Sequence, residues 1–201
     1  MLNDSLTEEN PLLSYNGKAF EGGLIAYFAK DVSRVIDFLT TLHTDDPHHL
    51  LTNRLNMDKL GAFGVSLGGI IVSEASCKDR RIKASLIMES PIPKKIAQTG
   101  LPIPIMVITR PAEAMRTERK KSGGWTESDI EQHLSTMRAL FENTAESEFV
   151  QLPDMFHVDF TDVPLWIPFA QQLGLSGSTP IEETHDKLNS LTLKFFEEYL
   201  Q

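Results

Sequence analysis

The chain has 201 residues, enough for a domain with its own core, and an ordinary globular composition with 41% hydrophobic and 23% charged residues. Its formal net charge of −9 argues against a nucleic-acid-binding surface, which should be basic. The single cysteine, Cys77, excludes an internal disulfide and a cysteine-based metal site.

The N-terminal part of the chain is predicted to lead from a loop into a helix. Residues 1–23 contain Asn-Pro, Asn-Gly and Gly-Gly pairs, which favour a loop or extension ahead of a catalytic domain of residues 24–201. Apolar residues at spacings of three and four predict an amphipathic helix over residues 24–42. The polar segment 43–56 contains histidines and aspartates, and we favour a solvated loop over a metal site, because no separated set of ligands accompanies it.

A Gly-x-Ser-x-Gly motif follows, centred on Ser66. The apolar run of residues 59–65 precedes the motif and a second apolar run to residue 77 follows it, which predicts a strand, a sharp turn and a helix, the pattern of a nucleophile elbow. Gly64 and Gly68 are expected because a side chain at either position would collide with the neighbouring strand or helix. The helix would direct its positive end at Ser66, and the Leu67 N–H would be free to donate to an oxyanion.

The alternative interpretation of this motif is an ordinary glycine-rich turn between a strand and a helix. A phosphate-binding turn is disfavoured, because no lysine follows as in a Walker loop and the glycines do not have the Gly-x-Gly-x-x-Gly spacing.

Three more strands are predicted, over residues 82–88, 103–109 and 148–152. Because the strands alternate with helices, the connections should be right-handed crossovers and the sheet mostly parallel. The loops at the carboxyl ends of parallel strands should then hold the active site.

The remaining predictions concern the helical segments and three histidines. The charged segment of residues 116–121 is interpreted as a surface face, with a substrate-gating role as the alternative. Thr126 is expected to begin a helix, with Asp129 completing a capping box. The residues expected on the buried face of this helix are Ile130, Leu134, Met137 and Phe141. The histidines interpreted as solvated are His43, His133 and His185. A last helix is predicted over residues 181–200.

Ser66, Glu89 and His157 each follow the end of a predicted strand, in the chain order nucleophile, acid and histidine. A serine hydroxyl needs an imidazole to accept its proton, and a carboxylate must orient that imidazole and stabilise its charged form. We therefore predict Ser66 as nucleophile, His157 as general base and Glu89 as acid. Glu113, which follows the strand of residues 103–109, is the alternative acid.

Three segments also carry a family resemblance: residues 57–69 (MDKLGAFGVSLGG), 81–86 (RIKASL) and 156–165 (FHVDFTDVPL). From about residue 24 to its end, the chain resembles the platelet-activating factor acetylhydrolase family of α/β-hydrolases, of the plasma and bacterial type. The resemblance implies a three-layer α/β-hydrolase sandwich with a mostly parallel sheet. The family's triad acid lies about where Glu89 stands here, 23 residues after Ser66. The family usually has Asp there, so Glu89 is a departure.

The resemblance implies cofactor-free and metal-free hydrolysis of carboxylic esters, with short-chain or phospholipid-like esters as small-molecule substrates. In this family several strands precede the elbow strand, whereas only 65 residues precede Ser66 here, and they favour loop and helix. We therefore expect the C-terminal half of the fold, from the elbow strand onward, with no recognisable second oxyanion donor. The open sheet edge would be covered by a missing N-terminal part or by a second copy of the chain.

Two alternatives to an active esterase of this family stay open: a non-catalytic or truncated hydrolase-like protein, and a cutinase-like polyester hydrolase. We expect no nucleic-acid partner and no transmembrane segment, because no apolar run approaches the length of a membrane span. Residues 1–10 lack the pattern of a signal peptide, which would make the chain as given cytoplasmic and leaves the compartment of any longer form open.

Overall fold

The computed structural model describes residues 23–167 and 169–201. The predicted loop of residues 1–23 therefore lies outside the described residues, apart from Gly23. The chain divides into two compact units, residues 1–55 and 56–201, and each is described by itself. The domain boundary predicted between residues 23 and 24 adjoins the undescribed residues and stays a prediction.

The described part of the first unit, residues 23–55, contains helix α1 (Ile25–Thr44) and the loop that follows it. The buried carboxylate of Asp46 organises this loop, because it accepts hydrogen bonds from the backbone N–H groups of His48 (2.9 Å), Leu50 (2.8 Å) and Leu51 (2.9 Å). The side chains of His48 and His49 are exposed. The helix is the predicted one, extended by two residues at its C-terminal end.

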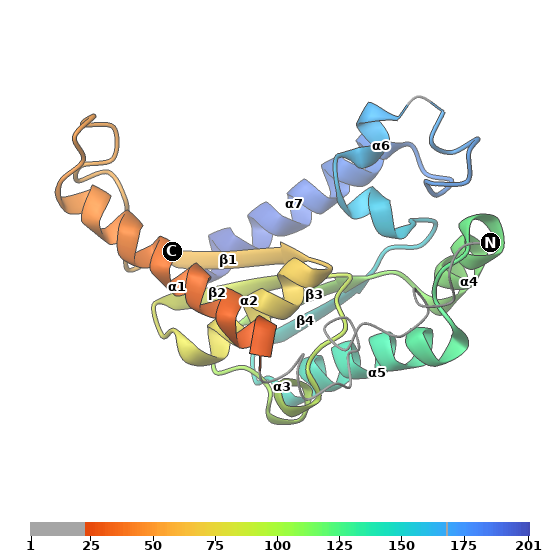
Figure 1. Cartoon of the computed structure of the whole chain (residues 1–201), viewed down its shortest axis with the longest axis horizontal. Helices are drawn as coiled ribbons and strands as arrows, with labels where there is room; N and C mark the ends of the chain where they lie inside the picture. The colour runs from red at the N-terminus through yellow and green to blue at the C-terminus, as the bar shows by residue number, and fades with distance from the viewer. Residues whose placement is uncertain (1–22, 168) are drawn as a thin grey trace, which may run out of the picture. The chain divides into compact units, whose positions relative to one another are not determined.

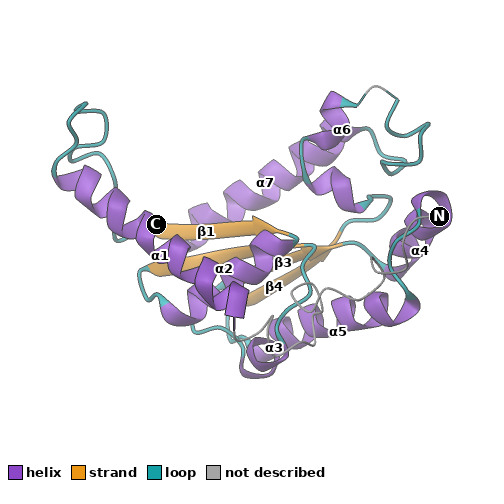
Figure 2. Cartoon of the chain, in the orientation of Figure 1, coloured by secondary structure: helices purple, strands orange, loops and turns teal. Residues whose placement is uncertain are grey.

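The second unit is built on a four-stranded sheet of β1 (Leu60–Val65), β2 (Ile82–Met88), β3 (Ile105–Thr109) and β4 (Ser147–Gln151). All neighbouring strands pair in parallel, in the order β1-β2-β3-β4 (Figure 2). The connecting segments contain α2 (Leu67–Lys78), α3 (Lys94–Thr99), α4 (Ala112–Ser122) and α5 (Glu127–Asn143). After β4 come a 3₁₀ helix (His157–Phe160), α6 (Val163–Trp166) and α7 (Ile181–Tyr199).

Alternate side chains of the central strands enter two hydrophobic cores, one on each face of the sheet. Leu86 and Met106 face the core that includes Leu188 and Phe195 of α7. Ile87 and Val107 face the other core, which is closed by residues of α3 and α5. In Figure 1, α7 accordingly lies above the sheet, and α3 and α5 lie below it. This arrangement of three layers confirms the predicted α/β class and the parallel sheet.

Helix α5 begins as predicted but buries a different face. Its capping box is present, since the Asp129 N–H donates to Thr126 Oγ1 (3.2 Å) and the Thr126 N–H donates to Asp129 Oδ2 (2.7 Å). The residues buried on α5 are Ile130, His133, Met137 and Leu140. The expected contributions of Leu134 and Phe141 are wrong, because those two side chains are only partly buried. Both sets of residues fit a helical repeat. The buried set could not be recognised from hydrophobic residues alone, because it includes the polar residue His133.

The interpretation of residues 116–121 as a charged surface face is wrong for one residue. The segment lies within helix α4, and Glu118 on this helix is buried. Glu113, Lys120 and Lys121 of α4 are exposed, and Arg116 and Arg119 are partly buried. Helix α4 therefore buries one carboxylate together with the apolar side chains of Ala114 and Met115.

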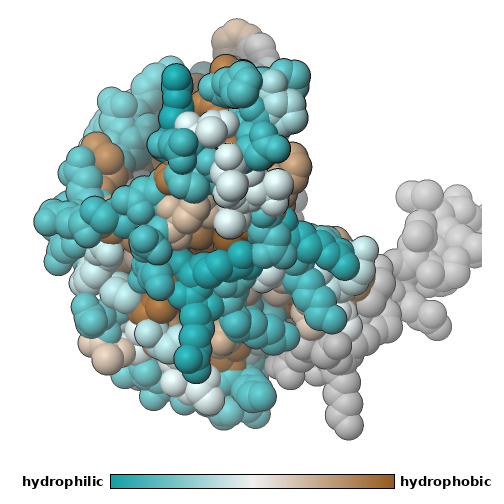
Figure 3. Space-filling view, turned by 90° about the vertical axis from the view of Figure 1, so that its left-hand side faces the viewer, coloured by the Kyte–Doolittle hydropathy of each residue, from teal (hydrophilic) through white to brown (hydrophobic). Residues whose placement is uncertain are grey.

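Among the described helices none has both the length and the apolar character needed to cross a membrane. On the face drawn in Figure 3, hydrophobic residues are scattered among hydrophilic ones. That face therefore shows no single large apolar patch in its described residues.

Candidate active site

Ser66 occupies the turn between β1 and α2 in a strained backbone conformation, with φ 55° and ψ −124°. Few non-glycine residues adopt a positive φ, and such residues are concentrated at functional sites. The Ser66 N–H donates to the Met88 carbonyl at the end of β2 (3.0 Å), and the Ser66 carbonyl accepts hydrogen bonds from the Gly69 N–H (3.0 Å) and the Ser90 hydroxyl. The turn is thus held from both sides, with the side chain partly exposed.

Of the two glycines expected to be required around Ser66, the structure requires only one. A Cβ at Gly64 would collide with the backbone carbonyl of Gly68, as predicted. The expectation for Gly68 is wrong, because a Cβ there would have nothing within 4 Å. The second position that excludes a side chain is Gly69, where a Cβ would collide with the Ser90 hydroxyl. Close packing of the turn therefore requires Gly64 and Gly69.

The Leu67 N–H belongs to the first turn of α2, directly after Ser66. Leu67 is the first residue of α2, and hydrogen bonding within the turn begins only with the Gly69 N–H. The first N–H groups of a helix have no intrahelical acceptor and carry partial positive charge, so they favour a negative charge nearby.

His157 lies beyond the end of β4, with Nε2 at 3.1 Å from Ser66 Oγ. Its side chain is 30% exposed. The buried carboxylate of Asp159 holds this loop by accepting hydrogen bonds from the Phe156 N–H (2.7 Å), the Ser176 hydroxyl (2.6 Å) and the Gly177 N–H (2.8 Å). The loop that carries the imidazole is thereby joined to the segment that precedes α7.

Glu89 lies just past the end of β2, and its side chain is completely buried. Its Oε1 lies 3.8 Å from His157 Nδ1, which is too far for a hydrogen bond. This nitrogen has no hydrogen-bond partner among the described residues. Burial alone raises the pKa of the Glu89 carboxyl. His133, His157 and Arg110 together outweigh burial and hold this pKa well below its ordinary value.

Sequence reasoning missed three polar side chains that surround this acid. Arg110 is fully buried, and its Nε donates to Glu89 Oε1 at 2.6 Å. Thr109 Oγ1 donates to Glu89 Oε2 at 2.9 Å. His133, interpreted as solvated, is fully buried, with Nε2 at 3.2 Å from Thr109 Oγ1 and 3.7 Å from Glu89 Oε2. The signal that could have found Arg110 is its place directly after a strand, where the active-site loops of a parallel sheet begin.

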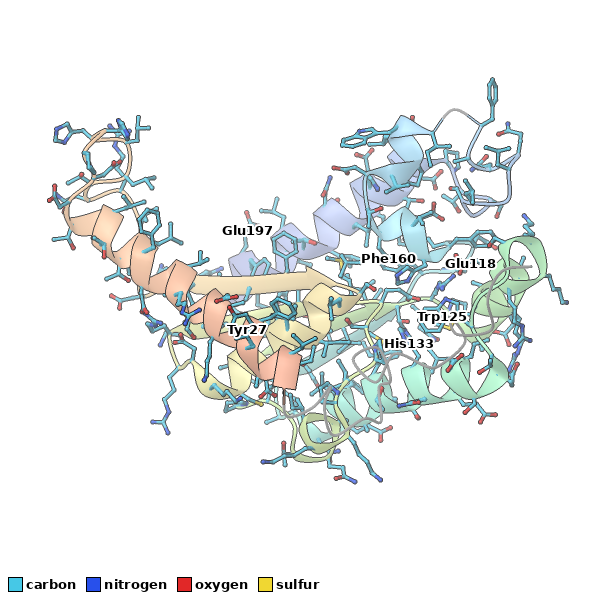
Figure 4. All side chains as sticks on the ribbon, viewed as in Figure 1. Tyr27, Glu118, Trp125, His133, Phe160 and Glu197 are labelled. Carbon is cyan, nitrogen blue, oxygen red and sulfur yellow. The ribbon has the colours of Figure 1, made fainter. Side chains whose placement is uncertain are left out.

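Glu118 and Trp125 complete the surroundings of the imidazole, and Figure 4 shows them with His133 beyond the carboxyl ends of the strands. Glu118 pairs with the Arg110 guanidinium and accepts the His157 backbone N–H at 3.2 Å. The Trp125 ring centroid lies 5.7 Å from that of His157 and 5.1 Å from that of His133.

The structure brings Ser66, His157 and Glu89 together, but it places Glu113 elsewhere. The Glu113 side chain is 79% exposed and lies 3.5 Å from Arg116 on the same helix. Within residues 23–167 and 169–201, no group of three or more histidine, cysteine or acidic side chains is arranged to hold a metal ion.

Comparisons with known proteins support the fold. No protein-family model matches the chain, and no curated protein matches it either. Among solved structures, a ferulic acid esterase from Streptomyces cinnamoneus is similar, with a TM-score of 0.67 and 20% sequence identity over 96% of this chain and 51% of the esterase chain. The chain therefore has an α/β fold with a four-stranded parallel sheet that matches about half of that esterase chain. The resemblance to platelet-activating factor acetylhydrolases stays a prediction.

Proposed function

We propose that this chain carries the catalytic residues of a serine carboxylic-ester hydrolase that acts through an acyl-enzyme. The observation that carries the proposal is the 3.1 Å separation between Ser66 Oγ and His157 Nε2, at a turn with a positive φ. The buried carboxylate of Glu89 on the far side of the imidazole supports the same assignment. Nucleophile, base and orienting acid are the three parts that such a mechanism needs.

The reaction begins when Ser66 Oγ attacks the ester carbonyl carbon and its proton passes to His157 Nε2. The negative charge on the carbonyl oxygen is stabilised by the Leu67 N–H, and the charge on the imidazole is stabilised by Glu89. Collapse of the tetrahedral intermediate expels the alcohol, which takes the proton from His157. A water molecule then attacks the acyl-enzyme and gives a proton to His157. When the bond between the acyl carbon and Ser66 Oγ breaks, His157 returns this proton to Oγ and the carboxylic acid leaves.

The geometry needs one adjustment before the acid orients the base. His157 Nδ1 and Glu89 Oε1 must approach by about 1 Å to form a hydrogen bond. Catalytic hydrogen bonds are often long without substrate and shorten in the Michaelis complex. Rotation of the partly exposed imidazole supplies this movement, since Glu89 itself is held in place by Arg110 and Thr109.

Short-chain or phospholipid-like esters are the proposed substrates. Their support is the resemblance of residues 57–69 and 156–165 to platelet-activating factor acetylhydrolases. The Leu67 side chain, 43% exposed beside the nucleophile, offers an apolar contact to an acyl chain. The likeness to a ferulic acid esterase supports a carboxylic ester in general, so an aromatic ester belongs among the substrates tested.

Labelling with a fluorophosphonate tests the nucleophile without knowledge of the substrate. We expect the folded wild-type chain to be labelled and the Ser66→Ala and His157→Ala variants to remain unlabelled. Labelling that persists in Ser66→Ala would place the reaction at another residue. A folded wild-type chain that is not labelled would favour the alternative of a non-catalytic protein.

A substrate panel then separates the ester classes. It contains p-nitrophenyl esters from acetate to laurate, a phospholipid with a short sn-2 acyl chain, methyl ferulate and a polyester film. We expect the acetate and the short-chain phospholipid to be cleaved fastest. Preferential attack on the film would instead support a cutinase-like polyester hydrolase.

A further inference from the structure

Four residues are joined in a ring of contacts, which we call the circuit: Glu89, Arg110, Glu118 and His157. Arg110 Nε donates to Glu89, and Arg110 Nη1 pairs with Glu118. Glu118 Oε1 accepts the His157 backbone N–H (3.2 Å), and the His157 ring faces Glu89 (3.8 Å). The members come from four separate parts of the chain, the ends of β2, β3 and β4 and the middle of α4.

The circuit carries one more negative than positive charge while the imidazole is neutral, since two carboxylates face one guanidinium. With Glu89 alone, the Arg110 charge would be balanced entirely by the acid that has to stabilise the imidazolium. Glu118 supplies the second carboxylate, so protonation of His157 brings the circuit to neutrality. All of these groups except His157 are buried, where charge interactions are stronger than in water.

We propose that Glu118 is a positioning residue of the ester hydrolysis: it takes up part of the Arg110 charge and fixes the His157 backbone, so that Glu89 stays available to the imidazole. This inference rests on the proposed function. Glu118 acts through Arg110 and His157 and makes no contact with the nucleophile in the structure, so it is distinct from the three proposed catalytic residues.

Glu118→Gln isolates the charge of this side chain. The glutamine has nearly the same shape, but its amide NH₂ replaces one of the two oxygens that accept from Arg110 and from the His157 N–H, so one of these donors would face another donor. We expect kcat for p-nitrophenyl acetate to fall about tenfold to a hundredfold, with KM unchanged, because only a proton-transfer partner is impaired. The rate of fluorophosphonate labelling should fall by the same factor.

Two further variants complete the experiment. Glu118→Asp keeps the charge on a shorter side chain and should lower kcat less than Glu118→Gln does. If Glu118→Gln fails to fold, the aspartate variant carries the test, and a wild-type kcat in it would overturn the proposal. Glu127→Gln is the matched control, because Glu127 also pairs with arginines, Arg116 and Arg119, but at the surface.

A double-mutant cycle separates positioning from a merely structural role. If Glu118 acts through Glu89, then Glu118→Gln should change the labelling rate little once Glu89→Gln is present. Fully additive losses, or a loss of folded protein without a change in the rate per labelled site, would overturn the role. A folded wild-type chain that is not labelled would overturn the proposed function together with it, whereas labelled wild type and an equally fast Glu118→Gln would overturn this inference alone.

Discussion

The buried carboxylate of Glu89 accepts a 2.6 Å hydrogen bond from Nε of the equally buried Arg110. Removing one partner of a buried ion pair leaves the other charge buried and unpaired. This is far more destabilising than losing an ion pair at the surface. The relationship therefore bears on folding as well as on the proposed chemistry.

Replacing Arg110 by methionine should lower the free energy of unfolding by about 3–5 kcal/mol, because Glu89 and Glu118 would remain buried without their cation. Urea denaturation followed by circular dichroism measures the change. Arg116→Met removes the exposed partner of Glu127 and should leave the denaturation midpoint almost unchanged. Equal effects of the two substitutions would contradict the importance of burial.

Glu89 should make stability depend on pH in the acidic range. Its pKa is lowered in the folded chain from an ordinary value of 4.5, so between the two values the unfolded chain binds more protons. The stabilisation from this carboxylate is therefore fully present well above pH 4.5 and is lost as the pH falls through the folded pKa. The wild-type chain should be more stable than Glu89→Gln at neutral pH, and the difference should shrink below pH 4.5. A difference that is constant with pH would contradict this prediction.

The two histidines near Glu89 should respond differently to substitution. His157→Ala removes the proposed base and should slow labelling at least a hundredfold. His133→Ala should keep labelling within about tenfold, since His133 does not contact Ser66. It should nevertheless lower the free energy of unfolding by about 2–3 kcal/mol, because a fully buried ring beside Trp125 is lost. The reverse pattern of labelling would show that the base is His133.

The glycines of the turn offer a matched pair of substitutions. Gly64→Ala should abolish labelling and destabilise the chain, because the new methyl group would collide with the backbone of Gly68. Gly68→Ala should fold at least as well as the wild type, since the methyl group meets nothing and alanine favours a helix by about 1 kcal/mol over glycine. Thermal melts and fluorophosphonate labelling distinguish the two. Loss of folding in Gly68→Ala would contradict the described turn.

The fold could be predicted from the sequence because its signals are local. Apolar runs bounded by turn residues predicted the strands, and Gly-x-Ser-x-Gly between two such runs predicted the turn at Ser66. Those patterns need no knowledge of distant residues. Ser66 was predicted from this motif, Glu89 and His157 were predicted from their places after strand ends together with the family resemblance, and the roles of all three stay predictions.

The partners of Glu89 could not be predicted in the same way. Glu118 lies in a run of charged residues, and only the Arg110 guanidinium from another element makes its burial favourable. His133 occupies a core position on α5 that an apolar residue would usually fill, and it is compatible with the core because it meets the polar group of Thr109. A pattern of hydrophobic residues carries no information about such pairs, since they form between segments far apart in sequence.

The free edge of the sheet leads to the last prediction. In the described part of the sheet β1 pairs only with β2, and Phe63 on this edge strand is 63% exposed. A strand with one unpaired edge and an exposed aromatic side chain favours association with another chain. A lysine on such an edge opposes this association. Phe63→Lys should therefore reduce self-association in analytical ultracentrifugation. Leu193→Lys provides the control, because Leu193 is similarly exposed at 60% but lies on helix α7. If both lysine variants associate as the wild type does, another surface joins the chains; if Leu193→Lys alone prevents association, that surface includes α7.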